Sequence, residues 1–403
     1  MVTKKVQEKR GVPKLRFSGF EGEWEEKKAG EIFENLSDKN HLGDLPLLAV
    51  TQNDGVVYRS DLELKINSSE EGIKNYKIIN PGNFVISLRS FQGGIEYSKI
   101  KGISSPAYTV LKSKIKIDDD FYRILFKKQS FINKLNSLIY GIRDGKQISY
   151  SEFKFLKLTY PKPEEQQKIA SFFGSVDEWI ENLKEQKENI ELYKKGMMQK
   201  IFSQEICFKD EKGKKFPEWD KKKLSSFLVE RSESSPKSVQ HPLMAFVAYI
   251  GVTPKGDRYN REFLVNDVGS KNYKRTEYGD FIYSSNNLET GSLGLNLYGS
   301  ASISPVYSIF KIGESCDHQF IHSYLTRKSF INKMIRYRQG VVYGQWKIHE
   351  SEFLKIEENI PSVKEQQKIA DFLTSLDKVI ESKQQQISQA EQWKKGLMQG
   401  LFV

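Results

Sequence analysis

The sequence has few cysteines and no long apolar run. Its two cysteines, Cys207 and Cys316, are too few for a disulfide framework or a four-ligand zinc site in a chain of 403 residues. The longest apolar stretch, residues 242–252, has 11 residues and is too short to span a bilayer. The N-terminal residues are polar and basic, without the apolar centre of a secretory signal. We therefore expect a cytoplasmic protein with reduced thiols and no membrane partner.

Motifs that identify common enzymes are also missing. Residues 141–146 have the wrong spacing for a Walker A loop, and no Asn-Pro-Pro-Tyr or Asn-Pro-Pro-Phe stretch occurs. Glu63 opens a short pattern that resembles the end of a nuclease site, but the second half of the chain has no counterpart. His318 and His322 are four residues apart, as zinc ligands on a helix can be, but no general-base glutamate accompanies them. We expect no catalytic residue and no metal site.

Basic residues outnumber acidic ones. The chain has 63 Lys and Arg against 52 Asp and Glu, which is a net charge of +11, and 12% of its residues are aromatic. A basic protein with many aromatic side chains suits a polyanionic partner, and nucleic acid fits better than an anionic membrane surface. Solvated lysines that serve only solubility are the alternative explanation of this charge.

The sequence is an internal repeat with a period near 200 residues. The segment Glu165–Ala170 recurs letter for letter as Glu365–Ala370, at an offset of 200. Shorter matches keep the same order further upstream, and Trp24 and Trp219 stand near the starts of the two copies. The last 40 or so residues of each copy are closely similar, whereas the preceding parts have diverged. The chain is therefore a tandem duplication in which one part kept its sequence and the other varied.

The two copied segments are predicted to be long helices with an apolar seam. Alternating steps of four and three residues from Ile169 and from Ile369 each meet eight apolar residues in ten. The seam residues we single out are Ile169, Phe173, Val176, Ile180 and Leu183 in the first segment, and Ile369, Leu373, Leu376, Ile380 and Ile387 in the second. Such a heptad pattern predicts a coiled coil, and chain connectivity makes the pair antiparallel. Two amphipathic helices that lie on separate globular cores are the alternative.

The segments that precede these helices are predicted to be globular domains of mixed α/β (α+β) class. Strand-like runs such as residues 84–88 alternate with turns, and residues 121–138 and 318–336 read as helices. The predicted organisation is a tail at 1–13, globular domains at 14–160 and 206–360, and long helices at 161–205 and 361–403.

The basic excess lies in the predicted globular domains. Residues 163–202 carry a net charge of −2 and residues 363–402 carry +1, so the rest of the chain holds the surplus. Arg reads guanine, and Asn or Gln reads adenine, through paired hydrogen bonds. The candidate DNA-binding residues lie in turn-rich segments: Gln52, Asn53, Arg89, Gln92, Arg143, Lys146 and Gln147 in the first domain, and Lys255, Arg258, Asn286, Asn287, Arg336, Arg338, Gln345 and Lys347 in the second.

A known family shows the same combination of features. A variable domain followed by a Pro-x-x-x-Glu-Gln-Gln-x-Ile-Ala helix, with the whole unit repeated, resembles the specificity subunit of Type I restriction–modification enzymes. The Leu15-Arg16-Phe17 opening, the loop at 141–148 and both Glu-Gln-Gln-Lys-Ile helices fit this pattern. No single motif is specific, but their combination covers essentially the whole chain.

The resemblance carries definite expectations. Each variable domain, at 14–160 and at 206–360, would be a target recognition domain that reads one half of an asymmetric bipartite site in double-stranded DNA. The paired helices would set the spacing and dock two modification subunits, which restriction subunits then join. This non-catalytic chain would hold no cofactor, with S-adenosylmethionine on the modification subunits and ATP and Mg on the restriction subunits. An autonomous nuclease or DNA methyltransferase with a degenerate site, and a coiled-coil scaffold that binds only proteins, are the alternatives.

Overall fold

The computed structural model describes residues 11–52, 54–62, 70–88, 90–138, 148–248, 250–255, 271–342 and 345–403. The chain divides into two compact units, residues 1–185 with 384–403, and residues 186–383. Each unit combines a globular domain with a section of each of two long helices, α7 (Pro163–Phe202) and α11 (Val363–Leu401). The globular part before α7 is called domain 1, and the part between α7 and α11 is called domain 2.

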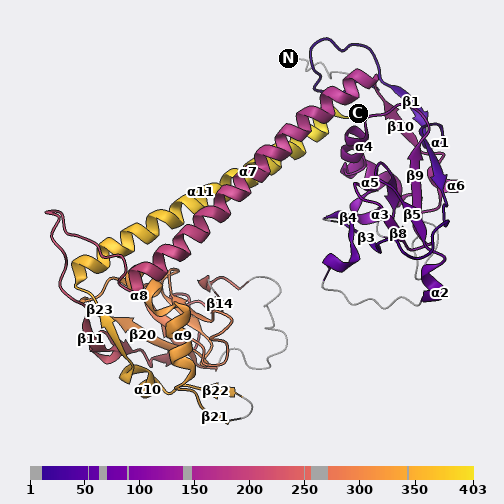
Figure 1. The fold of residues 1–403 in the computed structure, drawn as a ribbon. Helices are drawn as coiled ribbons and strands as arrows, with labels where there is room; N and C mark the ends of the chain where they lie inside the picture. The colour runs from indigo at the N-terminus through magenta and orange to yellow at the C-terminus, as the bar shows by residue number, and fades with distance from the viewer. Residues whose placement is uncertain are drawn as a thin grey trace. The chain divides into compact units, whose positions relative to one another are not determined.

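Domain 1 is built on a four-stranded antiparallel sheet (Figure 1). Its strand order is β2 (Phe33–Leu36), β9 (Thr109–Ser113), β6 (Phe84–Ile86) and β7 (Glu96–Tyr97). Three strand pairs accompany it: β1 (Glu25–Lys28) with β10 (Lys157–Tyr160), β3 (Leu48–Thr51) with β4 (Gly55–Tyr58), and β5 (Lys77–Ile79) with β8 (Gly102–Ser104). The short helices are α1 (Ala29–Ile32), α2 (Glu70–Ile73), α3 (Ser90–Gly93), α4 (Asp119–Leu125), α5 (Gln129–Asn136) and α6 (Tyr150–Phe153), with a 3₁₀ turn at Arg59–Asp61.

Aromatic rings fill the core of domain 1. The ring of Phe33 lies 5.5 Å from that of Phe84 and 5.4 Å from that of Tyr122, both edge to face. Such pairs stabilise a core by about 0.5–1.5 kcal/mol each beyond the burial of their area. Phe126 and Phe153 complete this fully buried cluster. Many of the aromatic residues that the sequence analysis related to nucleic-acid binding are therefore buried in the core.

Domain 2 repeats the fold. Its four-stranded sheet has the matching order β12 (Leu228–Glu230), β20 (Ser308–Ile312), β17 (Phe281–Tyr283) and β18 (Leu293–Leu295). The other sheets are β13 (Ser234–Ser235) with β16 (Tyr273–Thr276) and β19 (Ala301–Ile303), β11 (Asp220–Lys223) with β23 (Glu357–Ile360), β14 (Ala245–Val247) with β15 (Gly251–Thr253), and β21 (Gln339–Val342) with β22 (Gln345–Lys347). The helices are α8 (His318–Leu325), α9 (Lys328–Ile335) and α10 (Glu350–Lys355), with a 3₁₀ turn at Leu224–Ser226. Both domains are thus α+β, as expected.

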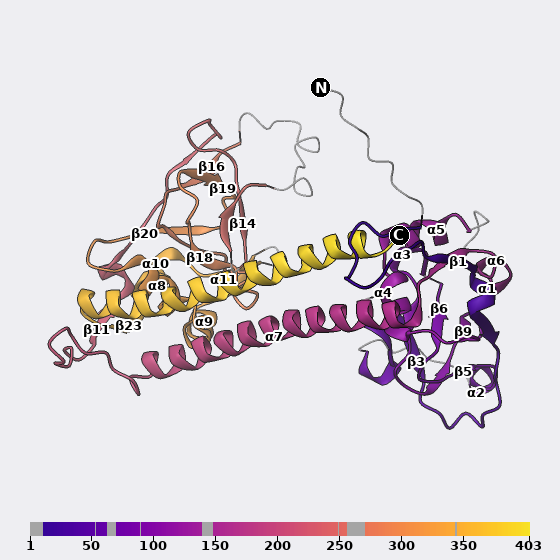
Figure 2. The same ribbon diagram turned by 90° about the horizontal axis from the view of Figure 1, so that it is seen from above.

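In both units α7 and α11 lie side by side and run in opposite directions (Figures 1 and 2). In the first unit an ion pair joins Asp177 of α7 to Lys394 of α11. In the second unit Lys194 of α7 lies 2.5 Å from Asp377 of α11. The residue number on α11 falls as that on α7 rises, so the pair is antiparallel, as predicted. An apolar cluster lies between the helices in the first unit: Val176, Ile180, Leu183, Ile387 and Ala390.

The ends of the helices pack on the globular domains. Ile169 and Phe173 belong to the core of domain 1, where the C-terminal residues Leu401 and Phe402 of the chain join them. Ile369, Leu373 and the α7 residue Ile201 belong in the same way to the core of domain 2. Leu376 and Ile380 are only half-buried. The apolar seam therefore has two roles. Its middle residues pack one helix against the other, and its end residues contribute to the cores of the two domains.

Candidate nucleic-acid interface

The copied Glu-Gln-Gln motif anchors each domain to its helix. The carboxamide oxygen of Gln166 accepts a hydrogen bond of 2.9 Å from the backbone N–H of Asp118, and its nitrogen donates to the carbonyl of Pro161 at 2.8 Å. The Asp118 side chain in turn accepts from the N–H of Phe121 at 2.9 Å and caps α4. One buried glutamine thus joins the start of α7 to the start of α4.

The second copy repeats this arrangement. Gln366 accepts from the N–H of Asp317 at 2.9 Å and donates to the carbonyl of Pro361 at 2.9 Å. Asp317 caps α8 by accepting from the N–H of Phe320 at 2.8 Å. The motif is therefore structural, and it holds the two domains in the same way on their helices.

The glutamate of the motif is paired in only one copy. Glu165, which is 2% exposed, accepts two hydrogen bonds from the guanidinium of Arg16, at 2.8 and 2.9 Å. Glu365 is 4% exposed, and its Oε2 atom has no hydrogen-bond partner. Burial raises the pKa of Glu365, and a hydrogen bond from Trp219 opposes that rise. A buried carboxylate without a cation is costly, so the second copy carries a defect that the first lacks.

Two aromatic pairs identify the residue that replaces the arginine. The ring of Phe17 lies 5.4 Å from that of Phe172, and the ring of Phe208 lies 5.9 Å from that of Phe372. Since Phe172 and Phe372 are 200 residues apart, Phe17 and Phe208 are equivalent. The residue before Phe208 is Cys207, which is exposed and stands where Arg16 stands in the first copy.

In domain 1, two of the predicted DNA-binding residues meet. The side chain of Gln52, in the turn between β3 and β4, donates to that of Gln92 in α3 at 3.1 Å. Lys127 links the β3–β4 turn to the end of α3, since its ammonium group donates to the carbonyls of Gln52 at 3.5 Å and Gly93 at 2.9 Å. The same ammonium group forms an ion pair with Glu96. This pair of amides thus stands on a fixed support.

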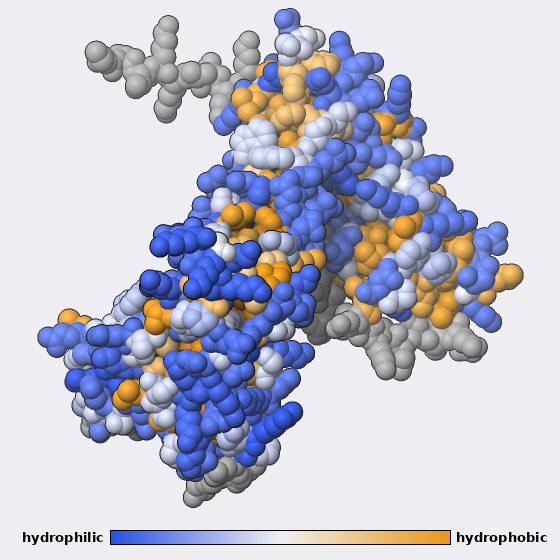
Figure 3. Space-filling view, turned by 60° about the vertical axis from the view of Figure 1, so that its left-hand side comes forward, coloured by the Kyte–Doolittle hydropathy of each residue, from blue (hydrophilic) through white to orange (hydrophobic). Residues whose placement is uncertain are grey.

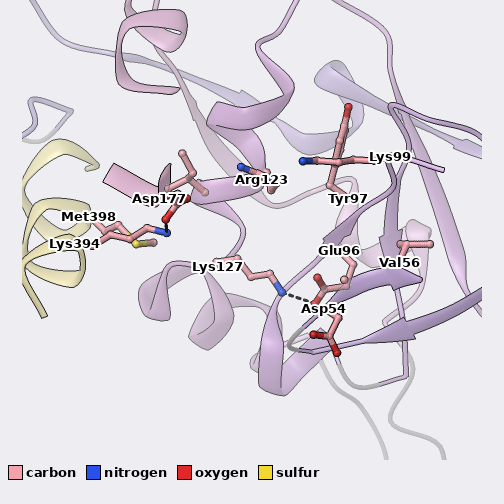
Figure 4. Close-up of a pocket in the computed structure, with 12 residues that line it drawn as sticks. Asp54, Val56, Glu96, Tyr97, Lys99, Arg123, Lys127, Asp177, Lys394 and Met398 are labelled. Carbon is pink, nitrogen blue, oxygen red and sulfur yellow. Dashed lines mark hydrogen bonds and ion pairs between the residues drawn. The ribbon is translucent and has the colours of Figure 1, made fainter. Parts of the chain in front are cut away.

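A charged cleft of about 460 Å³ lies beside this support, between domain 1 and its helices (Figure 4). Figure 4 shows Lys127 directed toward Glu96, and Lys394 directed toward Asp177. Burial raises the pKa of Glu96, and the ammonium group of Lys127 opposes that rise. Lys99 lines the cleft without forming an ion pair to any residue that the structure describes, so it is available to a phosphate.

In domain 2, Arg338 supports a turn that carries two predicted asparagines. Its guanidinium forms a forked ion pair with Glu289, at 2.5 and 2.7 Å, and donates to the carbonyl of Ser285 at 2.9 Å. The asparagines follow directly, with Asn286 half-buried and Asn287 exposed. With its donors occupied in this way, Arg338 positions neighbouring groups rather than offering a free fork to guanine.

Strand β22 of the β21–β22 hairpin places Lys347 next to the turn that carries Asn286. Lys347 and Asn286 line one pocket, and Trp346, on the same strand as Lys347, lines it too. Trp346 is not among the predicted residues, although the sequence does show a tryptophan directly before a predicted lysine in this loop. The structure thus brings Asn286, Arg338 and Lys347 together around a tryptophan.

The other predicted positions are not part of these clusters. Lys255 and Arg336 are exposed and line neither pocket described above. Outside the described residues lie Asn53, Arg89, Arg143, Lys146, Gln147 and Arg258, together with the side chain of Gln345. Their roles stay predictions.

The described residues form neither a metal-ligand cluster nor a membrane-spanning helix. Within the described ranges, no three His, Cys, Asp or Glu residues are grouped as metal ligands would be. His322 is buried in domain 2, and that burial lowers its pKa. None of the described helices is long and apolar enough to cross a bilayer.

The chain contains an α+β domain twice, and each copy packs on a section of two antiparallel long helices. The loops of each copy carry amide and cationic side chains, and those of the second also carry a tryptophan. These features define a class of two-domain recognition proteins. The family model for the Type I restriction modification DNA specificity domain matches residues 21–192 and again residues 217–392. The chain therefore belongs to this family and carries two such domains in tandem.

Named relatives and solved structures agree with this assignment. The MjaIX specificity subunit of Methanocaldococcus jannaschii is 26% identical over 227 residues, which cover 53% of this chain and 52% of that protein. The MjaVIII specificity subunit of the same organism is 25% identical over 351 residues, covering 81% of this chain and 79% of that one. The chain thus spans about half the length of the first relative and more of the second.

Solved structures share the fold. The S subunit of a Type I restriction–modification system from M. genitalium has a TM-score of 0.53 at 15% identity, covering 97% of this chain and 99% of that one. A chain from a structural study of the complex assembly and conformational transition of the Type I system has a TM-score of 0.54 at 12% identity, covering 94% and 97%.

Proposed function

We propose that this chain is the non-catalytic DNA-recognition subunit of a Type I restriction–modification complex, and that each domain reads one half of an asymmetric bipartite site in double-stranded DNA. One observation carries the proposal. The two specificity domains are joined to their helices by the same glutamine, Gln166 in one and Gln366 in the other. The two domains differ, however, in the sequences of their loops. A duplicated support with diverged reading surfaces is what recognition of two different half-sites requires.

The two reading surfaces offer different chemistry. Domain 1 presents the amide pair of Gln52 and Gln92, and amides read adenine in the major groove. Domain 2 presents Asn286 and Lys347 beside an aromatic ring. Since the groups differ, we expect the half-sites to differ. Joining the two readers in one chain turns the second binding event into an intramolecular one, which raises the affinity for a site with both halves.

The helix pair is the proposed docking surface for two modification subunits. In the first unit Trp179 and Trp393 are about half exposed, and their rings lie 6.3 Å apart, edge to face. The equivalent positions in the second unit, 200 residues away, are Val379 and Tyr193, which are also exposed. On the face shown in Figure 3, hydrophilic residues predominate and apolar ones form small groups. Exposed aromatic residues are typical anchors of protein interfaces, and an exposed pair of large hydrophobic side chains at the equivalent place in each unit fits two copies of one partner.

The remaining chemistry is assigned to the partners. The modification subunits would bind S-adenosylmethionine and methylate adenine, and restriction subunits would supply ATP- and Mg-dependent cleavage. This chain would contribute sequence recognition in the cytoplasm and no catalytic group. A purified chain that cuts or methylates DNA by itself would contradict this division and favour an autonomous enzyme.

Single-molecule methylation mapping tests the proposal. Genomic DNA from cells with and without the gene is compared, with the partner subunits expressed in both. We expect a split motif with methylated adenine that disappears on deletion, and the motif itself then names both half-sites. An unchanged methylation pattern would count against the proposal and favour a protein-only scaffold.

A further inference from the structure

A pocket of about 430 Å³ opens on domain 2 beside the β21–β22 hairpin. Trp346 and Val306 contribute apolar walls, and they are 46% and 56% exposed. Asn286, Lys347 and Glu350 add polar groups to the lining. Its volume lies in the range of pockets that hold small organic ligands, and it is large enough for a nucleobase.

The tryptophan of this pocket is held in place although the core does not need it. Ile348, two residues further along, is completely buried and closes the core. The guanidinium of Arg338 lies over the ring of Trp346, 5.9 Å from its centroid, and Glu289 fixes that guanidinium by its forked ion pair. A cation over one face steadies an indole. Trp346 therefore offers a flat, positioned apolar surface that the fold itself does not use.

The polar groups suit the edge of a base. The side chain of Asn286 makes no hydrogen bond within the described part of the chain, so its amide can both donate and accept. Glu350 accepts from the hydroxyl of Ser308 at 2.8 Å and lies 3.7 Å from the ammonium of Lys274. A carboxylate accepts hydrogen bonds from exocyclic amines of bases. Lys347 is exposed and available to a neighbouring phosphate.

The tryptophan of the pocket wall has no counterpart in the sequence of domain 1. Between the last glycine of the G-x-x-x-G loop and the buried isoleucine that follows, domain 1 has only Lys146 and Gln147. Domain 2 has three residues there, Gln345–Lys347, with the tryptophan in the middle. The extra residue is aromatic, exposed and unmatched in the other copy, which ties it to what distinguishes the two readers.

We propose that this pocket takes up one nucleobase of the half-site read by domain 2, displaced from the base stack and stacked on the indole of Trp346. The inference rests on the proposed function, because its ligand is a base of the recognised DNA. Asn286 and Glu350 contact the edge of the base, and Lys347 contacts its phosphate. Stacking on an aromatic side chain offsets part of the cost of unstacking the base.

The test uses the full chain in complex with its modification subunits, and duplexes that carry the mapped site. At each position in turn, the base opposite is replaced by an abasic residue, because a base without its pairing partner is cheaper to displace. Abasic residues opposite the adenines that the modification subunits methylate should tighten binding in either half-site, because methyltransferases displace their target base. Beyond those positions, we expect tighter binding at one position of the domain 2 half-site and at no position of the domain 1 half-site. This gain should disappear in Trp346→Ala and persist in Trp346→Phe.

On the intact site, Trp346→Ala should weaken binding about 5- to 150-fold, the range for the loss of one base–aromatic stack. Tyr278→Ala removes another exposed ring of domain 2 that does not line the pocket, and it should leave binding unchanged. Unchanged affinity of Trp346→Ala, or the absence of an abasic gain, overturns the base pocket and leaves recognition of two half-sites intact. A wild-type complex with no sequence-specific binding would instead overturn the proposed function.

Discussion

The carboxamide of Gln166 accepts a 2.9 Å hydrogen bond from the backbone N–H of Asp118, 48 residues earlier in the chain. The buried side chain of Gln366 makes the same bond to Asp317, again at 2.9 Å. The most similar residues of the two halves therefore owe their likeness to a shared structural task, which is to join each helix to its domain. The loops that we propose contact DNA have no such shared task, and their sequences have diverged.

We expect Gln166→Leu to destabilise the first unit and Gln366→Leu to destabilise the second. Each change leaves a buried N–H and a buried carbonyl without partners, which costs about 1–3 kcal/mol per group. Hydrogen exchange of α4 and of α8 measures the two effects separately. The adjacent Gln167 is exposed, so Gln167→Leu is the matched control and should leave both helices protected. Equal loss of protection in both units from one substitution would contradict the anchor role.

We expect Cys207→Arg to stabilise the second unit by restoring the partner that Arg16 gives to Glu165. The gain should be about 1.5–3 kcal/mol near pH 7, typical of hydrogen bonds to charged groups. Denaturant unfolding measures it, with Cys207→Ser as the control for loss of the thiol. A substitution that leaves the free energy of unfolding unchanged would show that Glu365 is satisfied in another way.

The buried carboxyl group of Glu365 also predicts that the free energy of unfolding depends on pH. The pKa of Glu365 is raised in the folded chain, so the folded state binds its proton more tightly than the unfolded state does. Its contribution to the free energy of unfolding therefore falls as the pH rises from the ordinary pKa, near 4.3, through the raised value. Cys207→Arg should remove this fall, since a paired cation favours the ionised carboxylate. Glu365→Gln should also flatten the profile, which assigns the effect to this carboxyl group.

Lys127→Met should weaken reading of the first half-site, because the substitution releases the turns of Gln52 and Gly93 and leaves Glu96 buried without its cation. Its matched counterpart is Arg338→Met, which should affect only the second half-site. Binding of the subunit complex to duplexes with either half-site scrambled measures both. We expect about 10-fold or greater loss, since a lost hydrogen bond to a charged group costs about 1.5–3 kcal/mol. Loss at the wrong half-site would refute the assignment of domains to half-sites.

Trp393→Ala should weaken docking of a modification subunit at the first unit. Truncating a central aromatic anchor of an interface costs about 2 kcal/mol or more, which is roughly 30-fold in affinity. Analytical ultracentrifugation of the purified subunits measures the stoichiometry. We expect one modification subunit to dissociate at a protein concentration at which the wild-type complex is still intact. Leu42→Ala is the control, since Leu42 is 94% exposed and lies off the helices. A complex as stable as the wild type would place docking elsewhere.

Inserting one heptad into each of α7 and α11, at facing positions, should change the spacer of the recognised site. Seven residues lengthen a helix by about 10 Å, which corresponds to about three base pairs of B-DNA. Methylation mapping of cells that carry the variant measures the new spacing. A motif with the original spacer would contradict the role of the helices as a ruler, whereas unaltered half-sites serve as the internal control.

The duplication, the two long helices and the family resemblance are open to sequence reasoning because they rest on local or repetitive patterns. Glu165–Ala170 recurs at a fixed offset, and a seam of 3.5-residue period needs no knowledge of distant contacts. The positions of the α+β domains follow from what lies between the helices. The turn-rich loop segments are likewise visible in the sequence, but the structure brings only some of their residues together.

Other features depend on residues that are far apart in the chain. Lys127 was not a candidate, because its role depends on carbonyls at Gln52 and Gly93 that only folding brings near. The same holds for Arg338, whose guanidinium is occupied by Glu289, 49 residues away. By itself, the sequence determined that this protein is two copies of a DNA specificity domain on paired helices. Only the tertiary structure decided which side chains are held as supports and which, like Trp346, stay available to a ligand, because long-range packing determines which groups are already paired.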